Sequence, residues 1–149
     1  MGQDVYLAFC DDAVMAMRDM VSDLGDDLAN RPPDLPGANS PAQILTHCLG
    51  VMGWWAGAVN LGRQVERDRA AEFEAVCRVD DLAADVETAR RQLHADVAAA
   101  DPAAQPAQVD HAHGYDSQGA VLLHVYEELA QHRGQMEITR DLLVAAAAR

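Results

Sequence analysis

Two side chains that commonly bind metal ions lie four positions apart near the end of the sequence, at Glu128 and His132. At about 100° per residue, a helix places both on the stripe that also carries Val121 and Val125. A lone carboxylate is costly to bury on such an apolar face unless a cation or several hydrogen-bond donors satisfy it. A glutamate and a histidine one turn apart can offer an oxygen and a nitrogen to one metal ion.

His47 is a third candidate ligand on a different predicted helix, where it shares an apolar stripe with Ile44 and Val51. Its side chain is therefore expected to point inward. With Glu128 and His132 it would complete a three-ligand set that leaves a coordination position for water or substrate, as metal catalysis needs. On spacing alone a second interpretation stays open, in which Glu128 and His132 form a buried hydrogen bond and His47 is a separate core residue.

Further polar side chains lie near this set in the sequence. His124, one turn before Glu128, could be a fourth ligand, although we expect it in a second shell or at the rim. His111 and His113 fall in a predicted loop, where they either cover the site or are solvated residues. Cys48 could be a reactive thiol, but a small buried cysteine is the commoner case.

Four helices are predicted to position these side chains, over approximately residues 4–29, 41–62, 81–100 and 117–146. Apolar residues in the first helix alternate at spacings of three and four, which is typical of one buried stripe: Leu7, Cys10, Val14, Met17, Val21, Leu24 and Leu28. The third helix has a similar stripe of Leu82, Val86, Ala89, Leu93 and Val97. Four helices joined by connections predict an all-α fold, a four-helix bundle.

The first two predicted helices have recognisable ends. Pro32 and Pro33 end the first helix, because proline cannot continue a helix and disfavours the helical conformation before it. Ser40 and Gln43 form a capping box at the start of the second helix, and Pro41 suits its first position. These signals fix where the helix that carries the first histidine begins.

The second predicted helix is apolar on nearly every face, which predicts a central place in the core. Three glycines along it, Gly50, Gly53 and Gly57, would let a neighbouring helix approach closely. Both features predict that His47 lies on a buried and closely packed helix.

The last two helices are expected to begin at aspartate or serine caps, namely Asp80 or Asp81 and Asp116 or Ser117. Residues 63–79 are charged and lack a clear period, so they are interpreted as a connection with a short helical turn. A loop rich in proline, alanine, histidine and aspartate precedes the last helix.

Length, charge and cysteine content bound the function. The 149 residues, half of them apolar, suit one globular domain, and residues 1–149 are predicted to form it. A formal net charge of -13 opposes binding to nucleic acid or to anionic lipid. We expect no signal peptide and no membrane span. Three widely spaced cysteines without a CxxC motif favour reduced thiols and a cytoplasmic location.

Two stretches resemble a known family. HVYEELAQHRGQMEITRDLL (124–143) resembles the last helix of DinB-like proteins, in the branch related to mycothiol-dependent maleylpyruvate isomerase and the mycothiol S-transferases, often labelled DUF664-like. ILTHCLGVMGWWAGAVNLGRQVERDRAAEF (44–73) resembles the matching second helix and the loop after it. With the helix order, the resemblance covers nearly the whole chain and implies a DinB-like four-helix bundle.

The resemblance also implies a metal centre. Many DinB-like proteins use three histidines as ligands, whereas the mycothiol-linked branch has a glutamate in the middle position, as Glu128 is here. His47, Glu128 and His132 are the ligands that it implies, with zinc as the usual metal and nickel or another divalent ion as alternatives. Arg69, Glu72 and Arg140 also lie in the matching segments.

The implied activity is a metal-dependent thiol S-transfer, with mycothiol as cosubstrate, that detoxifies or modifies small electrophiles. A bound divalent ion lowers the pKa of a thiol and presents a thiolate. Arg69 and Arg140 could hold a carboxylate of thiol or substrate, or form surface ion pairs, and Trp54 is a further second-shell or substrate candidate. Related bundles often form homodimers, so a homodimer is also implied.

Two other functions stay open at this stage. One is a non-catalytic, stress-related metal-binding or scaffold bundle, which would show no thiol-dependent turnover. The other is hydrolysis by metal-bound water, which would need no added thiol.

Overall fold

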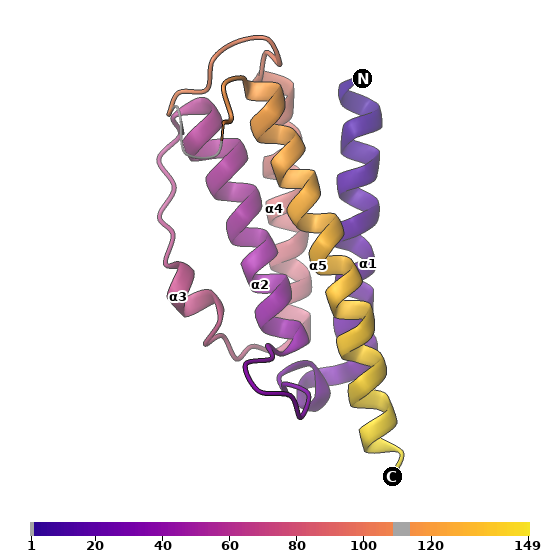
Figure 1. The fold of residues 1–149 in the computed structure, drawn as a ribbon. Coiled ribbons are helices and arrows are strands. Elements are labelled where there is room, and N and C mark those ends of the chain that lie inside the picture. Colours follow the sequence, from indigo (N-terminus) through magenta and orange to yellow (C-terminus); the bar gives the residue numbers. More distant parts are fainter. Residues whose placement is uncertain (1, 109–113) are drawn as a thin grey trace.

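A computed structural model describes residues 2–108 and 114–149 of the chain. Its long helices lie side by side as a bundle (Figure 1). They are α1 (Gln3–Ala29), α2 (Pro41–Val51) continued by the π-helix η1 (Met52–Val59), α4 (Val79–Ala99) and α5 (Gln118–Ala147). A single-turn helix, α3 (Arg69–Glu72), lies outside them. The predicted all-α four-helix bundle is therefore confirmed.

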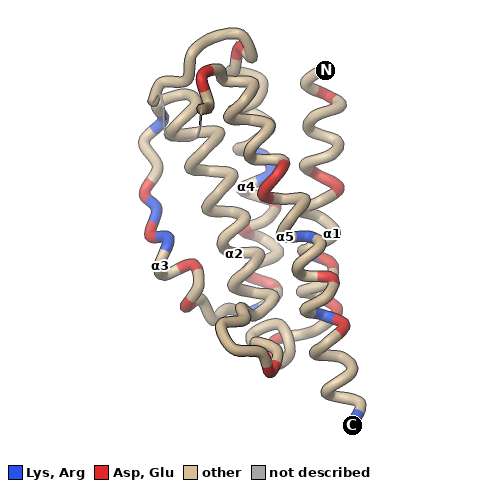
Figure 2. Tube along the Cα trace, in the orientation of Figure 1, with Lys and Arg blue, Asp and Glu red and all other residues tan. Residues whose placement is uncertain are grey.

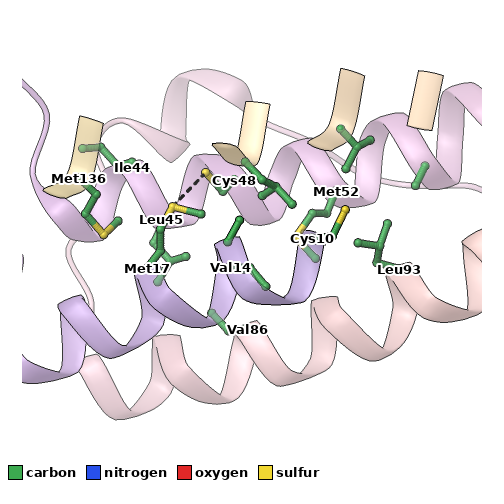
Figure 3. Packing of buried hydrophobic residues seen from close by; sticks show 14 of the residues in the cluster. Cys10, Val14, Met17, Ile44, Leu45, Cys48, Met52, Val86, Leu93 and Met136 are labelled. Atoms are coloured by element: carbon green, nitrogen blue, oxygen red, sulfur yellow. Dashed lines mark hydrogen bonds between the residues drawn. The ribbon is translucent and has the colours of Figure 1, made fainter. Parts of the chain in front are cut away.

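The middle of the predicted stripe of α1 is buried, while Leu7, Leu24 and Leu28 at its two ends are partly buried. Cys10, Val14, Met17 and Val21 are at most 1% exposed, and the core they enter includes residues from α2, α4 and α5. Figure 3 shows this packing, with the Cys48 thiol of α2 3.9 Å from the sulfur of Met17. The core therefore holds α1 and α2 together beneath the candidate site.

The start of α2 follows the predicted capping box. Ser40 Oγ accepts a hydrogen bond from the backbone N–H of Gln43 at 3.2 Å, and the backbone N–H of Ser40 donates to Gln43 Oε1 at 2.9 Å. Helical turns continue to Leu61, as expected, but residues 52–59 form a π-helix that the apolar pattern did not indicate. Periodicity alone does not separate these two helix types when nearly every face is apolar.

The cap predicted for the third long helix was wrong. Asp80 and Asp81 lie inside the first turn of α4, and the N-cap position is Arg78. The backbone N–H of Val79 instead donates to Asp26 Oδ1 of α1 at 2.8 Å, a long-range contact that local sequence cannot reveal. For α5, one of the two predicted caps is confirmed, because Ser117 Oγ accepts from the N–H of Ala120.

The role predicted for the glycines of the second helix also needs correction. The chain that lies over Gly50, Gly53 and Gly57 belongs to the connecting segment (residues 62–78), which includes α3, and not to one of the long helices. As expected, this segment is a connection with one short helical turn. Figure 1 shows it running beside α2. The glycines therefore accommodate side chains of the connecting segment.

Charge is unevenly distributed over the molecule. Figure 2 shows acidic residues along the long helices, whereas the connecting segment carries several of the basic ones. The segment holds four of the chain's 11 basic residues, Arg63, Arg67, Arg69 and Arg78, together with four acidic residues. Within the described residues, no helix is long and apolar enough to cross a membrane.

Candidate metal centre

Helices α2 and α5 bring the three predicted ligands together. Nε2 of His47 lies 3.5 Å from Glu128 Oε2, and Nε2 of His132 lies 3.3 Å from the same oxygen. One candidate ligand atom from each residue lies within 4.8 Å of the other two. The two imidazole rings meet edge to face, with their centroids 4.9 Å apart. Two nitrogens and one carboxylate therefore converge on a small region.

Hydrogen bonds orient both imidazoles toward that region. Nδ1 of His47 lies 2.8 Å from Glu72 Oε2, and Nδ1 of His132 lies 2.8 Å from Gln135 Oε1. Both partners are oxygen acceptors, so each ring is expected to carry its proton on Nδ1. The lone pair of each Nε2 is then available to a metal ion, and the donor set fits a divalent cation.

Glu72 is itself held firmly. Its carboxylate accepts from Arg67 Nε at 2.7 Å and from Arg67 Nη2 at 3.0 Å, a bidentate contact. The side chains of Glu72 and Arg67 are 8% and 11% exposed. The residues Arg67, Glu72 and His47 thus form a continuous buried chain of hydrogen bonds that ends at the candidate centre.

Glu72 was noted only for lying in a stretch that resembles the family, and Arg67 was not singled out from the sequence. They lie in a stretch with many charged residues, where the sequence does not distinguish a buried carboxylate from a solvated one. The only usable signal is the buried histidine on the preceding helix, because a ring that binds a metal needs an acceptor for its other nitrogen.

A pocket of about 370 Å³ opens beside the candidate centre. Three of the four predicted second-shell or substrate residues line it, namely Trp54, Arg69 and His124. Its full lining is His47, Val51, Trp54, Trp55, Arg67, Arg69, His124 and Glu128. A small molecule in this pocket would contact Glu128 and His47 directly.

His124 lies beside the three-residue cluster. Its Nε2 is 3.8 Å from Glu128 Oε1, the carboxylate oxygen that the other two histidines do not face. Its Nδ1 is 3.0 Å from the Tyr115 hydroxyl, and its ring meets the edge of Trp55 at 4.7 Å between centroids. Aromatic packing therefore fixes His124 on the wall of the pocket.

The two predicted arginines lie in different surroundings. The Arg69 guanidinium is 5.6 Å from the centre of the Phe73 ring, and that ring stacks on His47 at 4.8 Å. Arg140 pairs with its neighbour Asp141 at 2.8 Å and is not among the residues that line the pocket. His111 and His113 lie outside the described residues.

The cysteines are poorly suited to nucleophilic chemistry. Cys48 and Cys10 are fully buried. Burial raises the pKa of the Cys48 thiol well above its ordinary value and that of Cys10 to about 11. Both therefore stay protonated near neutral pH and are poor nucleophiles.

Comparison with known proteins gives one assignment. A family model described as Mycothiol-S-transferase matches residues 5–145. No curated protein matches the chain. The matched range includes both helices that carry the converging side chains and the connecting segment between them.

Proposed function

Because the chain belongs to the mycothiol S-transferase family, we propose that it is a metal-dependent transferase. In this proposal it joins the sulfur of mycothiol to small electrophiles. The observation that supports it most directly is the convergence of two Nε2 atoms on one oxygen of Glu128, while both Nδ1 atoms are bound elsewhere.

The proposed ligands are His47, Glu128 and His132. Two imidazole nitrogens and one carboxylate form one of the usual catalytic ligand sets of zinc, and nickel or another divalent ion suits the same donors. When bound, the ion would lower the pKa of a thiol and so supply a thiolate for attack on the electrophile. Glu72 would keep the proton of His47 on Nδ1 and so keep Nε2 free to bind.

The pocket is proposed to bind the reacting molecules. Trp54 offers apolar surface on its wall, and the Arg69 guanidinium forms no ion pair with any residue that the structure describes. An anionic group on the electrophile would therefore find a cation there without breaking an existing ion pair. His124 would contribute a fixed polar group to the same wall.

Two wider properties are also proposed. Residues 1–149 would form a single domain, since buried residues from α1, α2, α4 and α5 belong to one core cluster. A cytoplasmic location is supported by the three free cysteines.

The proposal is tested by a transfer assay on the purified protein. Mycothiol and a panel of other low-molecular-weight thiols would be combined with small electrophiles, with and without a chelator. We expect thiol-dependent turnover that the chelator abolishes and added zinc restores. Turnover without any thiol would indicate a hydrolase instead. A metal-loaded protein with no turnover on the whole panel would favour a non-catalytic metal-binding protein.

A further inference from the structure

The first part of the connecting segment has the alternation of an extended chain. Along residues 62–68, odd-numbered positions are partly buried and even-numbered positions are exposed. Successive side chains of an extended chain point to opposite sides, so Arg63, Val65 and Arg67 face the helix formed by α2 and η1. Each of them lies near one glycine of that helix.

Gly53 and Gly50 differ in how much room they leave for a side chain. A Cβ atom at Gly53 would lie 3.7 Å from Val65 Cγ1, an ordinary contact. A Cβ atom at Gly50 would lie 2.1 Å from Glu72 Oε1 and 3.2 Å from Arg67 Nε, so at least the carboxylate would have to move. The place that a side chain would occupy at Gly50 is therefore taken by the Glu72–Arg67 ion pair.

We propose that Gly50 is a positioning residue for the metal centre, because its missing side chain lets Glu72 reach Nδ1 of His47. This inference rests on the proposed metal-binding function. Glu72 approaches His47 across Gly50, and its hydrogen bond to the ring is 2.8 Å long. A methyl group at position 50 would push the carboxylate away and leave His47 without the acceptor that fixes its orientation.

The displaced group is the end of a flexible side chain, which makes the proposal testable in a folded protein. Glu72 can rotate away from a methyl group without moving the backbone of α2 or of the connecting segment. The Gly50→Ala variant is therefore expected to fold and to lose the Glu72–His47 contact. The ligands themselves stay unchanged.

The experiment compares Gly50→Ala with Gly53→Ala. Both substitutions replace a glycine by alanine on the side covered by the connecting segment, Gly50 in α2 and Gly53 in η1, but only the first displaces Glu72. Zinc alone is titrated into the metal-free protein against a chromophoric chelator. We expect Gly50→Ala to weaken zinc binding by about 10- to 100-fold, the range for lost partners of metal ligands. The zinc affinity of Gly53→Ala should stay within about twofold of the wild type, because this substitution leaves the partner of the metal ligand in place.

A double-mutant cycle shows whether the effect passes through Glu72. Glu72→Ala should weaken zinc binding by a similar factor, and adding Gly50→Ala to it should cause no further loss. Nuclear magnetic resonance of ¹⁵N-labelled histidine gives a readout without metal. The hydrogen-bonded Nδ1 signal of His47 should be present in the wild type and in Gly53→Ala, and absent in Gly50→Ala.

The outcomes separate the two proposals. If the wild type binds zinc and Gly50→Ala binds it equally well, the role proposed for Gly50 is wrong, while the metal centre itself stands. If the losses of zinc affinity from Glu72→Ala and Gly50→Ala add in the double variant, the role of Gly50 is also wrong, because Gly50→Ala then acts by a route other than Glu72. A wild-type protein that binds no zinc overturns the metal centre itself and, with it, any positioning role for Gly50.

Discussion

His47 and His132 are oriented by oxygen acceptors from different parts of the chain. Gln135 is on the same helix as His132, one turn away, whereas Glu72 reaches His47 from the connecting segment. The local contact depends on helical spacing alone, and the distant one depends on the whole connection being in place. Changes in the connecting segment are therefore expected to affect His47 first.

Thiol reactivity provides a prediction at the scale of single residues. A pKa of about 11 for Cys10, against 9.0 for an ordinary thiol, leaves about 100-fold less thiolate near neutral pH. The shift for Cys48 has the same sign and the same main cause, burial. At pH 7.5 iodoacetamide should modify Cys77, which is partly exposed, well before Cys10 or Cys48.

Peptide mapping by mass spectrometry after timed labelling measures this order, with protein unfolded in urea as the control in which all three cysteines react. Rapid native labelling of Cys48 would contradict the assignment of the thiol as inert. It would also reopen a nucleophilic role for this cysteine.

Ser40 provides a prediction at the scale of one helix. It is fully buried and its hydroxyl caps α2 seven residues before His47. Ser40→Ala should lower the free energy of unfolding by about 1 kcal/mol, because the N–H of Gln43 loses its acceptor. Urea denaturation followed by circular dichroism measures the change. The control is Ser22→Ala, an exposed position inside α1 where alanine should not destabilise the helix.

The helices could largely be predicted from the sequence, because apolar spacing and caps are local properties. The stripe of α1 and the capping box at Ser40 follow from residues at most a few turns apart. The contact of Val79 with Asp26 joins residues 53 positions apart, and no local pattern encodes it. The π-helix and the course of the connecting segment over the glycines also depend on tertiary packing.

The same distinction applies to the candidate site. His47, Glu128 and His132 were recognisable because each combines a metal-binding side chain with an apolar helical face. Glu72 was noted for its family-like stretch, but neither its role nor that of Arg67 could be recognised, since a charged stretch without a period hides which of its members are buried. Their place next to His47 requires three-dimensional knowledge of where the connection runs.

Net charge provides a prediction for the whole molecule. With a formal charge of -13 and acidic residues along the long helices, the protein should be repelled by the phosphate backbone. Fluorescence anisotropy with a labelled duplex is expected to show no binding at low salt, where such contacts are strongest. Tight binding that weakens as salt is added would contradict this expectation.

The central claim concerns metal binding by three side chains, and metal content tests it most directly. Elemental analysis of the purified wild type should find about one divalent ion per chain, because the three donors surround one position. Glu128→Gln and His132→Ala should each lose most of it, while circular dichroism shows an unchanged helical fold. Arg140→Gln, on the same helix but outside the pocket, should keep it. Full metal content in both ligand variants would contradict the assignment of the site.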